Sequence, residues 1–287
     1  MQRRACLQAL ATSGWVALES ANAAQQNQLR IGLTPVILAD QAAFLSRWGR
    51  YLSERTGCDV SFIARESYQP ILDQLFSAQI DAAWICGYPY VRHESQLAML
   101  CVPLYMGRPS YQAYLIRARK GTQQIAGWAD LKGKVLAYSD PLSNSGWLVA
   151  QVEMAKVGID QRELTKTFFA HGHRNVAEAV ASQLANAGSI DGYVWETMMQ
   201  QKMAAAARTE VIWKSEPFGF PPLVTLRGSR HPFIAPLQKA LMSMADDAAG
   251  KDLLSALNLS GFTTGQAQFF DSIRQQARLV AGSGVVS

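Results

Sequence analysis

The sequence predicts an α/β protein of two lobes, in which each lobe has a central sheet flanked by helices. Short apolar runs bounded by turn residues recur along the chain, as expected of buried strands. Between them lie longer segments whose apolar residues are three or four positions apart, as expected of helices. This alternation is typical of α/β units built on parallel or mixed sheets. A chain of 287 residues is long enough for two lobes.

The first hundred residues alternate between expected strands and helices. A helix at residues 39–56 places Phe44, Trp48 and Leu52 on one face, and Gly57 ends it. Ser67 is the expected N-cap of the next helix. Strands are expected at residues 29–33, 58–64, 81–85 and 97–104.

The alternation continues from residue 111 to about residue 214. A helix is expected at 147–157, and the last helices, at 252–259 and 266–279, are expected to rejoin the first lobe. The strands of this part are expected at residues 113–117, 134–138, 165–169 and 192–195.

Two lobes that share two chain crossings explain this pattern better than two separate domains. The crossings are expected near residues 105–112 and 214–222. One lobe then consists of residues 24–108 and 218–287, and the other of residues 109–217.

The N-terminus has the pattern of an export signal. Arg3 and Arg4 give a positive start, an apolar stretch follows to about residue 18, and Ala-Asn-Ala at 21–23 offers small residues for cleavage. We therefore expect residues 1–23 to be a signal peptide and the mature protein to be periplasmic. A short amphipathic helix is the alternative, and the paired arginines leave the choice between general and twin-arginine export open.

Composition and charge exclude several classes of protein. Hydrophobic residues make up 49% of the chain and charged residues 17%, which indicates a packed globular protein. Cleavage after residue 23 would remove two positive charges and one negative charge and lower the formal charge from +5 to +4. No run of five like charges occurs, so we expect no nucleic-acid partner. A mildly positive protein favours encounter with anions.

Residues 141–147, Pro-Leu-Ser-Asn-Ser-Gly-Trp, carry the clearest functional signal. They connect an expected strand to an expected helix. The first N–H groups of a helix lack internal partners, and the helix dipole favours negative charge there. Ser143 and Ser145 would add two hydroxyl donors. The segment is therefore interpreted as a cradle for a small oxyanion, although Ser143 or Asn144 as an ordinary N-cap would explain it too.

With these segments in view, the chain resembles the periplasmic solute-binding proteins of phosphate, phosphite and phosphonate ABC importers. The resemblance covers nearly all of the mature chain. Each matching segment is short, and their order and spacing carry the signal. The segments are residues 31–35 (Ile-Gly-Leu-Thr-Pro), 67–68, 81–85, 107–111 (Gly-Arg-Pro-Ser-Tyr), 130–134, 140–146, 172–173, 191 with 196, and 211–215 (Val-Ile-Trp-Lys-Ser).

This resemblance implies a type II periplasmic binding protein, a two-lobed "Venus flytrap" that closes on a ligand in its cleft. It implies that the protein is not an enzyme and that it needs no cofactor and no metal. The expected partners are a small oxyanion and the permease of an ABC transporter, and we expect a monomer.

The resemblance also assigns ligand contacts to positions of this chain. Two tyrosines would donate hydroxyl hydrogens, and Asn144 stands where the family has the central threonine of a Ser-Thr-Ser run. A histidine would donate to the anion, and an acidic residue would face the far side of the ligand or a protonated oxygen. These contact positions are Tyr68, Tyr111, Ser143, Asn144, Ser145, His173 and Glu196.

Two departures from the family pattern bear on the ligand. Pro221 stands where phosphonate binders have an aspartate that holds a substrate amine, which argues against an aminoalkylphosphonate. Cys86 stands where the family usually has glycine, at the end of a strand that points to the cleft. A cleft thiol suits a thiophilic ligand such as arsenite. An arsenite-type sensor that signals to a histidine kinase is therefore the alternative function, with Cys86 as a ligand contact.

Two further possibilities concern the cysteines and catalysis. Three cysteines remain after cleavage, so at least one is free, and a disulfide between Cys86 and Cys101 stays open. Ser143 or Ser145 with His173 and Glu196 has the residue types of a Ser-His-acid triad. The chain has no Gly-x-Ser-x-Gly motif, and two hydroxyls beside an amide suit anion binding better than one activated nucleophile.

Overall fold

The computed structural model describes residues 27–35, 42–120 and 124–282. The predicted signal peptide lies outside these residues, as do the first three residues of the helix predicted at 39–56. Within the described ranges, no helix has both the length and the apolar character needed to cross a membrane.

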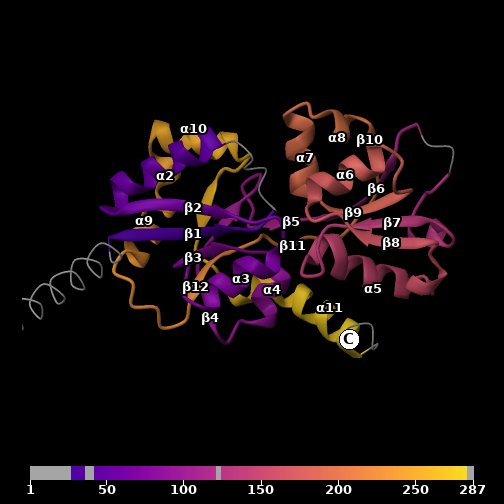
Figure 1. The fold of residues 1–287 in the computed structure, drawn as a ribbon, viewed down its shortest axis with the longest axis horizontal. Helices are drawn as coiled ribbons and strands as arrows, with labels where there is room; N and C mark the ends of the chain where they lie inside the picture. Colours follow the sequence, from indigo (N-terminus) through magenta and orange to yellow (C-terminus); the bar gives the residue numbers. More distant parts are fainter. Residues whose placement is uncertain (1–26, 36–41, 121–123, 283–287) are drawn as a thin grey trace, which may run out of the picture.

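The first sheet has six strands in the order β13-β4-β12-β3-β1-β2 (Figure 1). Strand β1, next to the β2 edge, runs parallel to β2 and β3, whereas β12 runs antiparallel to β3 and β4, and β13 runs antiparallel to β4. The strands are β1 (Gln28–Leu33), β2 (Asp59–Ala64), β3 (Ala82–Trp84), β4 (Leu97–Leu104), β12 (Leu223–Leu226) and β13 (Gly261–Thr263).

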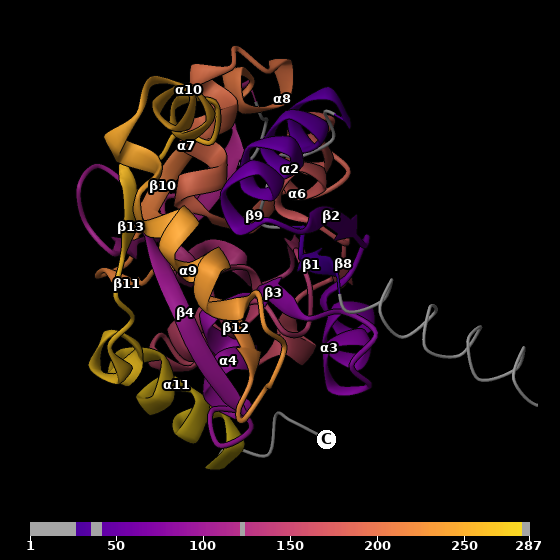
Figure 2. The same cartoon turned by 90° about the vertical axis from the view of Figure 1, so that its left-hand side faces the viewer.

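Helices cover this sheet because their apolar faces match it. Helix α2 turns Phe44, Trp48 and Leu52 inward, and the Trp48 ring stacks on Phe62 of β2 with ring centroids 4.6 Å apart. Helices α9 and α10, from the C-terminal part of the chain, pack beside α2 (Figure 2). The helices of this half are α2 (Ala42–Thr56), α3 (Tyr68–Phe76), α4 (Gly87–Arg92), α9 (Ile234–Met242) and α10 (Ala248–Ala256).

The second sheet has five strands in the order β10-β6-β9-β7-β8. Strand β7 is parallel to both β8 and β9, and β6 is antiparallel to β9 and β10. Its strands are β6 (Ala113–Ala118), β7 (Val135–Tyr138), β8 (Lys166–Phe169), β9 (Ala187–Asp191) and β10 (Thr209–Lys214), and its helices are α5 (Val149–Lys156), α6 (His173–Ala181), α7 (Gly192–Gln200) and α8 (Ala204–Ala207).

Two segments join the halves of the molecule. Strands β5 (Ser110–Tyr111) and β11 (Phe218–Gly219) pair antiparallel and lie between the two sheets (Figure 1). The C-terminal helix α11 (Asp271–Gly282) contacts α4 in one half and α5 in the other. The predicted two-lobed α/β architecture, with a helix-flanked sheet in each lobe, is confirmed.

One predicted strand is wrong. Residues 192–195 were expected to form a strand, but they begin helix α7, and the strand is the preceding segment β9. A short apolar run does not distinguish a buried strand from a buried helix. The true strand contains Gly188, which the packing of α6 requires, since a Cβ at this position would lie 2.5 Å from Val176.

Candidate functional site

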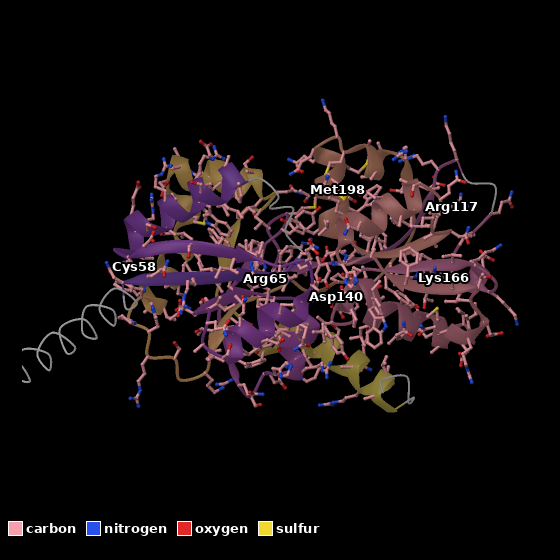
Figure 3. The ribbon with its side chains drawn as sticks, viewed as in Figure 1. Cys58, Arg65, Arg117, Asp140, Lys166 and Met198 are labelled. Atoms are coloured by element: carbon pink, nitrogen blue, oxygen red, sulfur yellow. The ribbon has the colours of Figure 1, made fainter. Side chains whose placement is uncertain are left out.

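A group of buried polar side chains lies where the two sheets meet. It follows the carboxyl ends of strands β2 and β3 in one sheet and β7 and β9 in the other. Figure 3 labels Asp140, which follows β7, at this junction. Ligands of open α/β sheets bind outside the carboxyl ends of the strands, so this is the position expected of a ligand site.

The segment after β7 forms a tight turn into α5. Residues Asn144–Leu148 form a single π-helical turn, a rare geometry that often occurs at functional sites. Ser143 is its N-cap, and the Ser143 Oγ accepts a hydrogen bond of 2.9 Å from the Gly146 N–H. A Cβ at position 146 would lie 1.8 Å from the Ser139 Oγ, so the turn requires glycine there. Ser143 can be both the N-cap of this turn and a donor to an oxyanion, because a hydroxyl that accepts a hydrogen bond as an N-cap keeps its own hydrogen to donate.

His173 lies at the first position of α6 with a defined tautomer. Gly172 before it has φ of +133°, a conformation that favours glycine. The His173 Nδ1 accepts the Asp191 backbone N–H at 3.0 Å, so the ring proton resides on Nε2. Nε2 lies 3.2 Å from the Tyr68 hydroxyl and 3.4 Å from the Ser143 Oγ. Burial lowers the pKa of His173 to about 3, so the ring is a neutral donor at neutral pH.

A second chain of hydrogen bonds runs from Tyr111 to Cys86. The Asn144 side-chain Nδ2 donates to the Tyr111 hydroxyl at 3.0 Å. The Asn144 backbone N–H donates to the Cys86 Sγ at 3.3 Å. Burial raises the pKa of the Cys86 thiol to about 11, so it is a neutral thiol, and Cys58, Cys86 and Cys101 are all free.

The two hydrogen-bonded groups of side chains share one property. Three of their hydroxyl oxygens already accept an N–H, and each of these hydroxyls keeps a hydrogen to donate. Tyr68 accepts from the His173 Nε2–H, Ser143 accepts from the Gly146 backbone N–H, and Tyr111 accepts from Asn144. All three side chains are at most 2% exposed. Burial raises the pKa of both tyrosines well above the usual value, so they stay protonated. Among the described residues, no lysine or arginine pairs with any of these side chains.

Two acidic residues of the site were not predicted as contacts. The Asp140 carboxylate accepts the Tyr68 backbone N–H at 3.1 Å, so it caps α3 from the opposite half, where Ser67 makes no side-chain cap. Asp191 is fully buried, and its Oδ1 accepts the Val194 N–H while its Oδ2 has no hydrogen-bond partner. Burial raises the pKa of Asp191 to about 8. A carboxylate at the end of a strand and the start of a helix was the sequence signal for both.

The structure brings together most of the predicted site residues. Tyr68, Ser143 and His173 form one hydrogen-bonded group, and Cys86, Tyr111 and Asn144 form the other. Ser145, the residue after Asn144, is fully buried, and its backbone oxygen accepts a hydrogen bond of 2.7 Å from the Ser189 hydroxyl.

Glu196 lies apart from this group. Its carboxylate accepts from the Tyr114 hydroxyl at 3.1 Å and is 3.9 Å from the Lys214 Nζ. It lines an open pocket of about 520 Å³ that also borders Tyr111 and Gly192. The acidic group beside the buried hydroxyls is Asp191, five residues earlier in the chain.

The fold and this buried interlobe site define the class of protein: a two-lobed periplasmic binding protein of type II. Solved structures agree. The binding protein component of an ABC phosphonate transporter from Pseudomonas aeruginosa superposes with a TM-score of 0.80 at 21% identity, over 88% of this chain and 86% of that one. PhnD1 of Prochlorococcus marinus in complex with methylphosphonate gives a TM-score of 0.76 at 16% identity, over 89% and 99% of the two chains. At these identities the likeness shows the fold.

The family follows from the sequence. Residues 31–269 match the family of ABC transporter phosphonate periplasmic substrate-binding proteins, and the chain belongs to that family. The phosphate-import protein PhnD of Mycolicibacterium smegmatis is 27% identical over 181 residues, which are 58% of this chain and 56% of that protein. The match thus spans about half the length of that relative. Members of the family are substrate-binding proteins and not enzymes, and none of these similarities supports the sensor alternative.

Proposed function

We propose that this protein captures a small phosphorus oxyanion, a phosphonate, phosphite or phosphate, in the periplasm and delivers it to the permease of an ABC importer. One observation carries the proposal: the hydroxyls of Tyr68, Tyr111 and Ser143 each accept an N–H and each retain a hydrogen to donate inside a buried site. A ligand that satisfies them must present several acceptor oxygens close together.

The charge of the site suits an anion held by dipoles. A neutral His173, three hydroxyls and the turn at the start of α5 supply donors without a cationic partner. Hydrogen bonds to a charged oxygen are about twice as strong as neutral ones, so several together compensate for removing the anion from water. The names of related proteins, a phosphate-import protein and a methylphosphonate complex, point to the same ligand class.

We assign roles in ligand binding to six of the predicted residues. Tyr68, Tyr111, Ser143 and Ser145 would donate hydroxyl hydrogens to the ligand. His173 would hold Tyr68 in place through its Nε2 hydrogen, and Asn144 would hold Tyr111 in place while its unpaired Oδ1 faces a protonated ligand oxygen. Cys86 forms part of the wall. Glu196 would be reached only by a ligand substituent that extends into its pocket.

Closure around the ligand would use the two crossings. We propose that residues 24–108 with 218–287 and residues 109–217 are the two lobes, and that β5 and β11 form the hinge. Two hydrogen bonds across the proposed boundary would hold the closed form together: the Asp140 carboxylate accepts the Tyr68 N–H, and the Tyr193 hydroxyl donates to the Leu257 carbonyl. The closed monomer would then dock on the permease.

A thermal-shift and calorimetric panel tests the proposal. The ligands are methylphosphonate, phosphite, phosphate, sulfate and arsenite, and the proteins are wild type, Ser145→Ala, Cys86→Ser and the control Ser182→Ala, whose hydroxyl donates to the Glu178 carbonyl on the surface. A ligand that binds only the folded state raises Tm. We expect at least one phosphorus oxyanion to bind wild type, Cys86→Ser and Ser182→Ala, and to bind Ser145→Ala more weakly. An arsenite response that disappears with Cys86 would replace the importer proposal with the thiol-based sensor.

A further inference from the structure

We propose that Asp191 determines specificity in this site: its carboxyl group and the bound oxyanion share one proton, so the complex forms only when one of them supplies it. The inference rests on the proposed function and adds to it the protonation state that the ligand needs.

Geometry places the carboxyl group against the oxyanion site. Asp191 ends the central strand β9, and its backbone N–H fixes the tautomer of His173. Its negative charge would raise the pKa of Tyr68 on α3, of Cys86 before α4 and of Tyr111 on β5. The charge of the side chain therefore acts on residues of both hydrogen-bonded groups, and its backbone contacts one of them directly.

The hydrogen bonding of Asp191 is incomplete. Oδ1 accepts the Val194 N–H at the start of α7, whereas the fully buried Oδ2 has no partner among the described residues. An ionised carboxylate only accepts hydrogen bonds, so beside a fully ionised oxyanion it would place two acceptors and two negative charges together. One proton between them converts this repulsion into a hydrogen bond.

The surrounding groups do not supply this proton near neutral pH. Burial keeps the pKa of Cys86 at about 11 and that of Tyr105 at about 12, and it raises the pKa of each remaining tyrosine that faces Asp191. His173 is already neutral. The Asp140 carboxylate accepts the Tyr68 backbone N–H, and Glu196 pairs with Tyr114 and Lys214. The groups that face Asp191 are Tyr68, Cys86, Tyr105, Tyr111, Tyr114, His173 and Tyr193.

Phosphate and methylphosphonate differ in this one respect. The hydrogen phosphate dianion carries an O–H and brings the shared proton with it. The methylphosphonate dianion carries none, so above the pKa of Asp191, about 8, its binding requires the uptake of one proton. Each pH unit above that point then lowers methylphosphonate affinity about tenfold relative to phosphate.

The experiment is calorimetric titration of the protein with methylphosphonate and with phosphate at pH 6.5, 8 and 9, each in two buffers of different ionisation enthalpy. Wild type should take up one proton per methylphosphonate at pH 9, and the ratio of phosphate to methylphosphonate affinity should rise about tenfold between pH 8 and 9. Asp191→Asn should show neither effect. Asp247→Asn is the matched control, since Asp247 is also an N-cap and accepts the Gly250 N–H outside the site.

The outcomes separate this inference from the proposed function. If neither ligand binds wild type at pH 6.5, the inference fails, and if phosphite does not bind either, the proposed function fails with it. If both bind at pH 6.5 but the affinity ratio stays flat in wild type, or rises equally in Asp191→Asn, only the role of Asp191 is overturned.

Discussion

Replacing Ser143 with alanine separates its two roles, the N-cap and the ligand donor. The side chain is fully buried, and its Oγ accepts the Gly146 N–H at 2.9 Å. Alanine leaves that N–H without an acceptor, which costs about 1–2 kcal/mol, the range of a lost N-cap. For a protein of this size, about 1 kcal/mol lowers Tm by roughly 2–4 °C, so we expect a decrease of about 2–8 °C without ligand.

The effect on binding adds to this loss and is measured separately. A lost hydrogen bond to a charged oxygen costs about 1–3 kcal/mol, so affinity for the preferred phosphorus oxyanion should fall roughly 5- to 150-fold. Differential scanning calorimetry gives Tm, and isothermal titration calorimetry gives Kd. Ser182→Ala is the control and should stay within about 0.5 kcal/mol in both measurements. A lower Tm with unchanged Kd would refute the assignment of Ser143 as a ligand contact and leave it a helix cap.

Three further predictions follow from the same geometry. Gly146→Ala should lower Tm and abolish ligand binding, since its Cβ would overlap the Ser139 Oγ. Adding Ser139→Gly to the same chain should restore part of the Tm and part of the binding, and a double variant that restores neither property would contradict the close approach. Tyr193→Phe removes the hydrogen bond from α7 to the Leu257 carbonyl at the end of α10, so it should weaken ligand binding about fivefold although no proposed ligand contact is removed, which calorimetry tests. The pKa of His173 is lowered in the folded state, so its contribution to stability is present above the ordinary pKa of 6.5 and is lost as pH falls toward about 3. The raised pKa of Asp191 acts in the opposite direction, so the stability of wild type relative to His173→Asn, measured by urea unfolding, should fall between pH 7 and 5; an unchanged difference would contradict a buried neutral ring.

The sequence predicted the fold well where local signals were strong. The parallel core strands β1 and β7 and helix α2 lie within a few residues of the predicted bounds, because apolar runs and helical spacing mark them. The error at 192–195 arose because Gly188 in β9 carries no strand signal. A side chain is excluded at this position because Val176 and Val180 pack closely against the strand there. That requirement is tertiary, and one sequence does not display it.

The sequence alone indicated the hydroxyl groups of the candidate site, but it did not indicate which acidic residue lies beside them. Ser143 and Ser145 stood out because hydroxyls at a strand-to-helix turn have a local meaning. Asp191 stood in the same context, but its function depends on full burial and on the backbone contact with His173, 18 residues away. The resemblance assigns the acidic contact to Glu196, and only the helical geometry of α7 shows that Glu196 turns toward Tyr114 and Lys214.

The most direct test of the central claim is a crystal structure of the protein grown with methylphosphonate or phosphate. We predict one oxyanion between the two sheets, with its oxygens accepting from the hydroxyls of Tyr68, Tyr111 and Ser143. An oxyanion bound instead in the open pocket at Glu196, with the three hydroxyls still paired only with protein, would contradict the account.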